Sequence, residues 1–257
     1  MDSKWKYGAE PPFSDPKAIT HYQSLCGSLN FYAQTARPDL AFAVGLLCRY
    51  LQRPNEQCMK AVRHVMSYLS GTTSLAIVYS PTSSDDLNCE AYCEHANWGS
   101  SNTAKSTSGS LILFAGGPID WASNLQSVVA LSSAESEHIA AFNTSRTIVY
   151  YRQFLEELGH IQYQPTTLWV DNTACIAQSK NPVNHKRNKH MLRKYHYLRD
   201  LVQDKQVRLQ YISTIDQIAD IFTKPLSTQL FERLVHFIVR PTLSSSSTSS
   251  AISSTSN

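Results

Sequence analysis

The sequence lacks the features of a membrane-spanning or secreted protein. Its 257 residues contain no apolar run of the roughly 18–20 residues that a membrane-spanning helix needs. Residues 1–20 carry charged side chains and no apolar core, so we expect no secretory signal there. The six cysteines form no Cys-x-x-Cys pair, which favours reduced thiols in an intracellular protein, cytoplasmic or nuclear.

Charge is also scarce, and its distribution is uneven. Charged residues make up 17% of the chain and hydrophobic residues 42%, which argues against disorder over most of the length. Residues 180–208 hold nine Lys or Arg and two acids, whereas the whole chain has a net charge of only +3. Such a block is typical of a surface that faces a polyanion, and a solvated helix face is the alternative.

The order of the expected elements predicts an α/β protein with a mixed sheet. Helical patterns between residues 20 and 71 indicate a small helical subdomain, and strands followed by alternating helices and strands come after it. We expect a helical unit in residues 1–80, a second domain in 87–240 and a disordered Ser/Thr-rich tail in 241–257. The later elements are expected at 75–79, 88–93, 108–114, 118–122, 133–158, 166–170, 173–179, 189–204 and 206–212, with a helix opening near Asp216.

Glu137 is the first candidate for chemistry. Ser132 and Glu135 fit a capping box at the start of the helix expected at 133–158, so Glu135 has a structural role. Glu137 instead lies in line with Ala141 and Ile148 on the apolar face. A buried carboxylate needs a partner, and a metal ion, a salt bridge or a hydrated first turn would each satisfy it.

Two aspartates are weaker candidates. Asp171 directly follows the apolar strand 166–170, at the edge of the sheet where ligand sites form, and a helix N-cap is the alternative. Asp220 follows Asp216, which we expect to cap the next helix, so Asp220 is also explained as a first-turn acid.

The expected basic helix, 189–204, divides into two faces. Its apolar face, with Tyr195 and Leu198, is expected to pack on the protein. The opposite face, with Lys189, Arg193 and His196, is expected to point outward and to follow phosphates.

Several segments together resemble one known family, the Pol polyprotein of copia-type retrotransposons. The resemblance covers about residues 20–240 and corresponds to the carboxy-terminal part, where the end of reverse transcriptase precedes ribonuclease H. The supporting segments, in the family's order, are Tyr22–Tyr32, Thr35–Ala41, Lys105–Gly109, Val129–Glu137, Val170–Asn172, Lys189-His190 with Tyr195-His196, and Ala219–Pro225.

The resemblance implies a ribonuclease H-like fold and a two-metal site. The fold is a five-stranded mixed sheet with flanking helices, preceded here by a helical remnant of the reverse transcriptase thumb or connection. Four carboxylates of the family hold two Mg²⁺ ions, or Mn²⁺, and Glu137, Asp171 and Asp220 match three of them. His95 occupies the fourth position, and Glu94 lies one residue away. Three alternatives remain for this fourth position: a one-residue bulge brings in Glu94, His95 itself is a ligand, or the site is broken.

The implied activity is cleavage of the RNA strand of RNA–DNA hybrids, recognised by helix shape and 2′-hydroxyl groups. A non-catalytic nucleic-acid-binding relic is the alternative. The rest of reverse transcriptase is a second implied partner, and a virus-like particle in the cytoplasm an implied location. No paired polymerase aspartates precede residue 20, so we expect no polymerase activity. The residues expected to contact nucleic acid are Lys189, Arg193, His196, Lys186 and Arg187.

Overall fold

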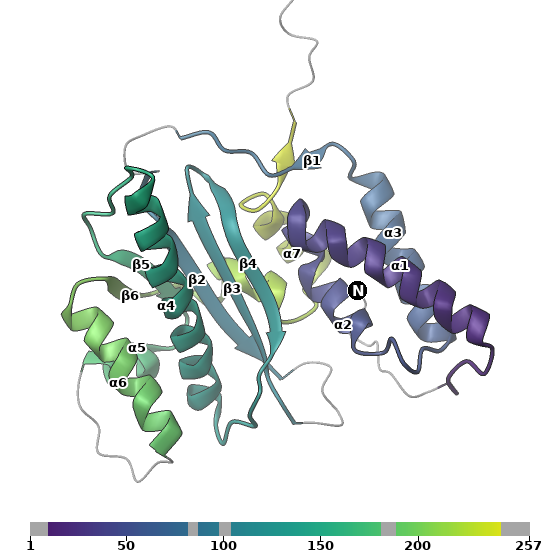
Figure 1. Ribbon diagram of the computed structural model, residues 1–257, viewed down its shortest axis with the longest axis horizontal. Coiled ribbons are helices and arrows are strands. Elements are labelled where there is room, and N and C mark those ends of the chain that lie inside the picture. Colours follow the sequence, from purple (N-terminus) through teal and green to yellow (C-terminus); the bar gives the residue numbers. More distant parts are fainter. Residues whose placement is uncertain (1–9, 82–86, 98–103, 181–188, 243–257) are drawn as a thin grey trace, which may run out of the picture.

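A computed structural model describes residues 10–81, 87–97, 104–180 and 189–242 (Figure 1). In these ranges the chain forms a helical part and a sheet with helices on both faces. No helix found there is long and apolar enough to cross a membrane. The tail was expected to begin at residue 241, and Pro241 lies in a short strand, while residues 243–257 are outside the described ranges.

The helical part contains α1 (Pro16–Thr35), α2 (Ala41–Cys48) and α3 (Glu56–Gly71), within the segment where helices were expected. Local sequence sets where these helices begin. Asp15 caps α1 by accepting a hydrogen bond from the Lys17 amide at 2.9 Å, and Asn55 caps α3 through the Cys58 amide at 2.9 Å. A 3₁₀ turn, η1 (Pro38–Leu40), precedes α2 and begins at a proline, a residue that suits the first position of a helix.

The main sheet has five strands in the order β4-β3-β2-β5-β6, which confirms the mixed sheet of the ribonuclease H-like fold. The antiparallel strands are β2 (Glu90–Ala96), β3 (Thr107–Phe114) and β4 (Gly117–Leu125). The strands β5 (Thr166–Val170) and β6 (Val207–Tyr211) run parallel to β2. Separately, β1 (Leu75–Ala76) pairs with β7 (Arg240–Pro241), so the strand expected at 75–79 is shorter than predicted.

The β3–β4 hairpin turns one residue earlier than its glycine pair suggests. Two adjacent glycines such as Gly116-Gly117 favour a hairpin turn, but Gly117 is the first residue of β4. The turn residues are Ala115 and Gly116, with φ of 52° and 75°. Two consecutive positive φ values match the twist of the flanking strands, and glycine adopts the second one without strain.

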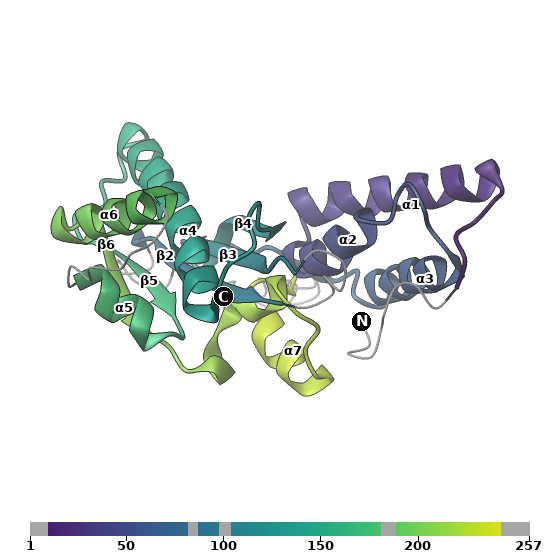
Figure 2. The ribbon, with the colours of Figure 1, turned by 90° about the horizontal axis from the view of Figure 1, so that it is seen from below.

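Helices cover both faces of the sheet (Figures 1 and 2). One face packs on α4 (Ser133–Glu157), α5 (Thr173–Lys180) and α6 (Lys189–Gln203), around a core that includes Cys93, Leu168 and Leu198. The other face packs on α7 (Thr228–Val235) and a 3₁₀ helix, η4 (Ile218–Phe222), around Tyr92 and Leu111. Figure 2 shows α1, α2 and α3 beside this second face.

The prediction of a helix that opens near Asp216 is wrong. The chain forms two 3₁₀ pieces instead, η3 (Thr214–Asp216) and η4, separated by Gln217 with an extended backbone. The Gln217 side chain accepts a hydrogen bond from the Ala219 amide and so caps η4 in place of Asp216. Because η4 is short, Asp220 is held by packing against the sheet rather than by a regular helix.

Candidate functional site

The expected site residues come from four segments that meet where β2 and β5 end. These strands pair in parallel up to Tyr92 and Trp169, so their carboxyl ends lie at the same edge of the sheet. Glu94 and His95 belong to the last residues of β2, and Asp171 directly follows β5. Glu137 lies in the first turns of α4, and Asp220 lies in η4.

The bulge proposed for Glu94 is wrong. The pairing of β2 with β3 continues without a shift from Glu90 to Ala96, with Glu94 opposite Gly109 and His95 opposite Ser108. Side chains alternate along a strand, so His95 lies on the α4 side and Glu94 on the η4 side. Both nevertheless reach the site, because it lies at the end of the strand.

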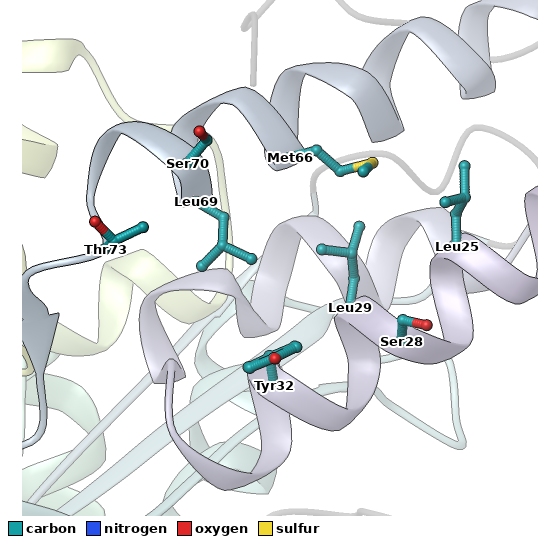
Figure 3. Close-up of a pocket in the computed structure, with 8 residues that line it drawn as sticks. All are labelled: Leu25, Ser28, Leu29, Tyr32, Met66, Leu69, Ser70 and Thr73. Atoms are coloured by element: carbon teal, nitrogen blue, oxygen red, sulfur yellow. The ribbon is translucent and has the colours of Figure 1, made fainter.

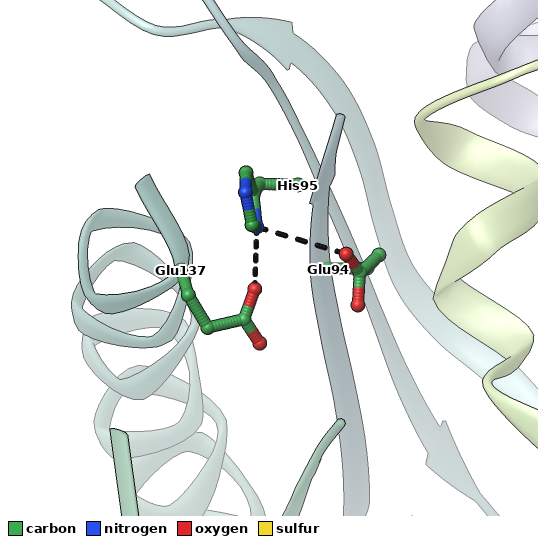
Figure 4. A group of neighbouring side chains, drawn as sticks. All are labelled: Glu94, His95 and Glu137. Carbon is green, nitrogen blue, oxygen red and sulfur yellow. Dashed lines mark hydrogen bonds and ion pairs between the residues drawn. The ribbon is translucent and has the colours of Figure 1, made fainter. Parts of the chain in front are cut away.

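Glu94, His95 and Glu137 form a compact group that can hold a metal ion. Each offers one ligand atom, and these atoms lie within 4.8 Å of one another. His95 Nδ1 is 2.6 Å from Glu137 Oε2 and 3.6 Å from Glu94 Oε1 (Figure 4). The other carboxylate oxygens, Glu94 Oε2 and Glu137 Oε1, are buried and have no hydrogen-bond partner among the described residues.

Asp171 and Asp220 lie close enough to influence this group but have contacts of their own. The Asp171 Oδ2 atom accepts a hydrogen bond from the Thr214 hydroxyl at 3.1 Å. Lys224 Nζ is 2.7 Å from Asp220 Oδ1, and the Asp220 side chain is 2% exposed. The structure therefore brings Glu94, His95 and Glu137 into direct contact and leaves the two aspartates outside that cluster.

Burial and repulsion between neighbouring acids make the ionised forms of Glu94, Glu137 and Asp220 costly. Burial, reinforced by the charges of Glu137 and Asp171, raises the pKa of Glu94 to about 10. Burial also raises the pKa of Glu137, against the opposing effect of His95, and it raises the pKa of Asp220, against that of Lys224. The four carboxyls thus share one electrostatic environment that a cation would stabilise.

The first turns of α4 are anchored in a way that fixes Glu137. Ser132 Oγ accepts from the Glu135 amide at 3.2 Å, as the capping box predicts, but Glu135 accepts from the Leu131 amide instead of that of Ser132. Gln126, which the sequence did not single out, donates to the Ser136 carbonyl at 2.9 Å. Ala141 and Ile148 are buried in line with Glu137, which confirms its expected apolar face.

Gly109 permits the close packing that places Asp220. A Cβ atom at this position would lie 2.7–2.8 Å from Thr223 Cγ2, the Ala219 carbonyl oxygen and Phe222 Cβ. Real Cβ contacts are essentially never this short, so η4 could not approach β3 so closely with any other residue there. The resemblance segment Lys105–Gly109 therefore has a structural role next to the acids.

The division of α6 into two faces is confirmed for the side chains that the structure describes. Tyr195 and Leu198 are buried, whereas Arg193 and His196 are exposed. Lys189 lies in the first turn of α6, but its side chain is outside the described set, and Lys186 and Arg187 lie outside the described ranges altogether.

A second feature, an apolar pocket of about 290 Å³, lies between α1 and α3 (Figure 3). Leu25, Leu29, Met66 and Leu69 are among the residues that line it. None of the expected site residues contributes to its wall.

Curated relatives establish the family. The chain is 36% identical over 211 residues to the "Retrovirus-related Pol polyprotein from transposon TNT 1-94" of Nicotiana tabacum, covering 82% of this chain and 16% of the relative. It is 35% identical over 214 residues to the corresponding polyprotein from transposon RE1 of Arabidopsis thaliana, covering 83% and 14%. The chain belongs to the Pol polyprotein family of copia-type retrotransposons. It spans only about one seventh of the length of these relatives, and no family model matches it.

Solved structures show more distant likenesses. The foamy viral protease-reverse transcriptase in complex with an RNA/DNA hybrid has a TM-score of 0.44 at 11% identity, covering 80% of this chain and 26% of that one. LC11-RNase H1 in complex with an RNA/DNA hybrid has a TM-score of 0.40 at 11% identity, covering 53% and 94%. These scores are too low to establish the fold, which rests on the strand order and directions.

Proposed function

We propose that this Pol chain is a metal-dependent ribonuclease that cleaves the RNA strand of RNA–DNA hybrids. The observation that carries the proposal is that four buried or half-buried acids at one edge of the sheet lie close enough to act on one another electrostatically. Each acid comes from a different segment, and no structural ion pair neutralises Glu94 among the described residues apart from the contact with His95. Such an arrangement is unfavourable for folding alone, which supports a functional role.

The residues present fit a divalent cation. Buried Glu94 Oε2 and Glu137 Oε1 lack hydrogen-bond partners within the described ranges, and carboxylate oxygens are the ligands that Mg²⁺ and Mn²⁺ prefer. We assign Glu94, Glu137, Asp171 and Asp220 as the residues that would hold a pair of such ions. A bound pair would lower the pKa of water and stabilise the oxygen that leaves in an in-line phosphodiester cleavage.

The chain's own side chains would orient this site and its substrate. His95 holds Glu137 through the 2.6 Å contact, and Lys224 holds Asp220. The exposed face of α6 offers Arg193 and His196 to backbone phosphates, and we propose the same role for Lys189, Lys186 and Arg187, whose side chains lie outside the described set.

Cleavage of a labelled RNA–DNA hybrid in Mg²⁺ or Mn²⁺ tests the proposal. We expect metal-dependent cutting of the RNA strand only, with no cutting of an all-DNA duplex of the same sequence. Glu137→Gln and Asp171→Asn should each abolish cutting, whereas Glu232→Gln, which changes an exposed carboxylate on α7, should not. No cutting at any metal concentration, with salt-sensitive hybrid binding retained, would reject catalysis.

That outcome would favour a second function, non-catalytic binding of nucleic acid. The observation behind this second function is the position of His95. Its imidazole Nδ1 is hydrogen-bonded to Glu137 Oε2, so that oxygen already has a partner. His95→Asp distinguishes the two functions. If only one anionic ligand is missing, this variant should cut hybrids faster than the wild-type chain at the same Mg²⁺ concentration, because it adds a hard oxygen ligand.

We also propose that the helical unit in residues 1–80 and the domain in 87–240 are separate units and that the chain works with the rest of a reverse transcriptase. Support comes from a core formed only by helices α1 to α3 and their connections, around Tyr22, Leu47 and Val62. Expression of residues 87–242 alone, followed by an unfolding measurement, tests whether the second unit folds by itself.

A further inference from the structure

Arg49 is a half-buried cation at the edge of the helical part nearest the acids. It caps the C-terminus of α2, and its Nη2 atom donates a hydrogen bond to the Thr107 hydroxyl at 3.1 Å. Thr107 is the first residue of β3 and pairs with Ala96, the last residue of β2. Arg49 therefore contacts the sheet at the end where Glu94 and His95 lie.

Within the described part of the chain, Arg49 has no carboxylate partner. The Thr107 contact is the one hydrogen bond of its side chain there, although a guanidinium carries five N–H donors. Arg37 differs, because Asp39 and Thr72 satisfy its guanidinium. Burial lowers the pKa of Arg49, which reflects the cost of keeping a charge there without an anion. An anion from outside the chain would remove that cost.

An external anion bound to Arg49 would lie near the acids, and this position narrows the chemical class of that anion. Glu94 pairs with Gly109, two residues along β3 from Thr107, so the offset along the strand is about 7 Å. Thr107 and Gly109 share the η4 face of the sheet, whereas α6 packs with α4 on the opposite face. Arg49 thus lies on the η4 side of the sheet, whereas α6, which carries the exposed Arg193, packs on the other side.

We propose that Arg49 is a phosphate-binding residue of the nucleic-acid substrate site, contacting the backbone one or two nucleotides from the acids. This inference rests on the proposed function and extends the binding surface from α6 to the helical part. The nucleic acid then passes between α6 and the end of α2. The planar guanidinium suits a phosphate, because it can donate two parallel hydrogen bonds to its oxygens.

Binding of a labelled hybrid to the full chain, in EDTA and over a range of salt concentrations, tests this proposal without cleavage. Each phosphate contact contributes about −0.9 to the slope of log K against log salt concentration. We expect Arg49→Met to make this slope less negative by about 0.9. A fourfold rise in salt concentration should then reduce the affinity of the wild-type chain by a factor about 3.5 times larger than it reduces the affinity of the variant. Arg49→Lys should keep the slope but bind more weakly, because it keeps the charge and loses the fork.

Arg63→Met is the matched control, because Arg63 lies on α3 and pairs with Glu56 at 3.5 Å, away from the sheet. It should change neither the slope nor the affinity. If Arg49→Met folds and its slope equals that of Arg63→Met, the proposal is overturned. If Arg49→Met fails to fold, Arg49→Gln replaces it, and failure of both variants to fold makes Arg49 a structural residue and also overturns the proposal. Absence of salt-sensitive binding by the wild-type chain would instead reject the proposed function.

Discussion

Replacing Glu94 by glutamine should stabilise the protein in the absence of divalent cations. Burial and neighbouring acids raise the pKa of Glu94 from 4.5 to about 10, so the folded state holds a proton that the unfolded state releases above pH 4.5. Keeping this proton above pH 4.5 costs free energy of folding. A neutral glutamine removes that cost and keeps the shape of the side chain. The site would then be more stable but less able to bind a cation, as expected for residues kept for function.

The size of the effect follows from proton linkage. Because the folded pKa of Glu94 is raised, its contribution to stability is complete below pH 4.5 and is lost progressively up to about pH 10. One proton difference corresponds to a fall of about 1.4 kcal/mol in unfolding free energy per pH unit. Glu94→Gln should reduce the slope between pH 6 and 8 by up to about this amount.

Urea unfolding in EDTA between pH 6 and 8 measures this slope directly. We expect the wild-type chain to lose stability with rising pH and Glu94→Gln to lose less, while Glu232→Gln behaves as wild type. Added Mn²⁺ should stabilise the wild-type chain more than Glu94→Gln, because a bound cation stabilises the ionised carboxylate. Equal slopes for Glu94→Gln and the wild-type chain would refute the reasoning.

Four further variants test the packing next to the site and in the helical part. Gly109→Ala should lower the free energy of unfolding in urea by about 2–3 kcal/mol, because its Cβ would overlap η4. Gly27→Ala, on an open face of α1, should raise the free energy of unfolding by about 1 kcal/mol. The reverse order of stability would contradict the packing. Arg37→Met should cost about 3–5 kcal/mol, since it leaves Asp39 buried without its cation, and a loss below 1 kcal/mol would show that Asp39 is solvated. Asn55→Ala should lower the thermal midpoint by removing a cap that contributes about 1 kcal/mol, and an unchanged midpoint would argue against the cap.

The regular elements were predictable because their signals are local. The apolar face of the helix expected at 133–158 and the run at 166–170 depend only on residue spacing, and the observed elements are Ser133–Glu157 and Thr166–Val170. The prediction for the segment around Asp216 failed because the structure of that segment depends on long-range contacts. Its second 3₁₀ piece, η4, is held by contacts with a distant strand, which the local sequence does not report.

The site was predictable only in part. Spacing placed Glu137 on a buried face, but the meeting of Asp220 with β2 depends on Gly109, more than 100 residues away. The resemblance to the Pol family supplied that link. Arg49 and Gln126 gave no signal, because their importance lies in single contacts with residues far along the chain.

A calorimetric titration with Mn²⁺ that compares the wild-type chain with Glu137→Gln shows directly whether these acids bind a divalent cation. We expect saturable binding by the wild-type chain and an affinity about tenfold or more lower in the variant, because Glu137 lies in the group of candidate ligand atoms. Equal affinities in the two proteins, or no saturable binding by the wild-type chain, would contradict the claim that these acids form a divalent-cation site.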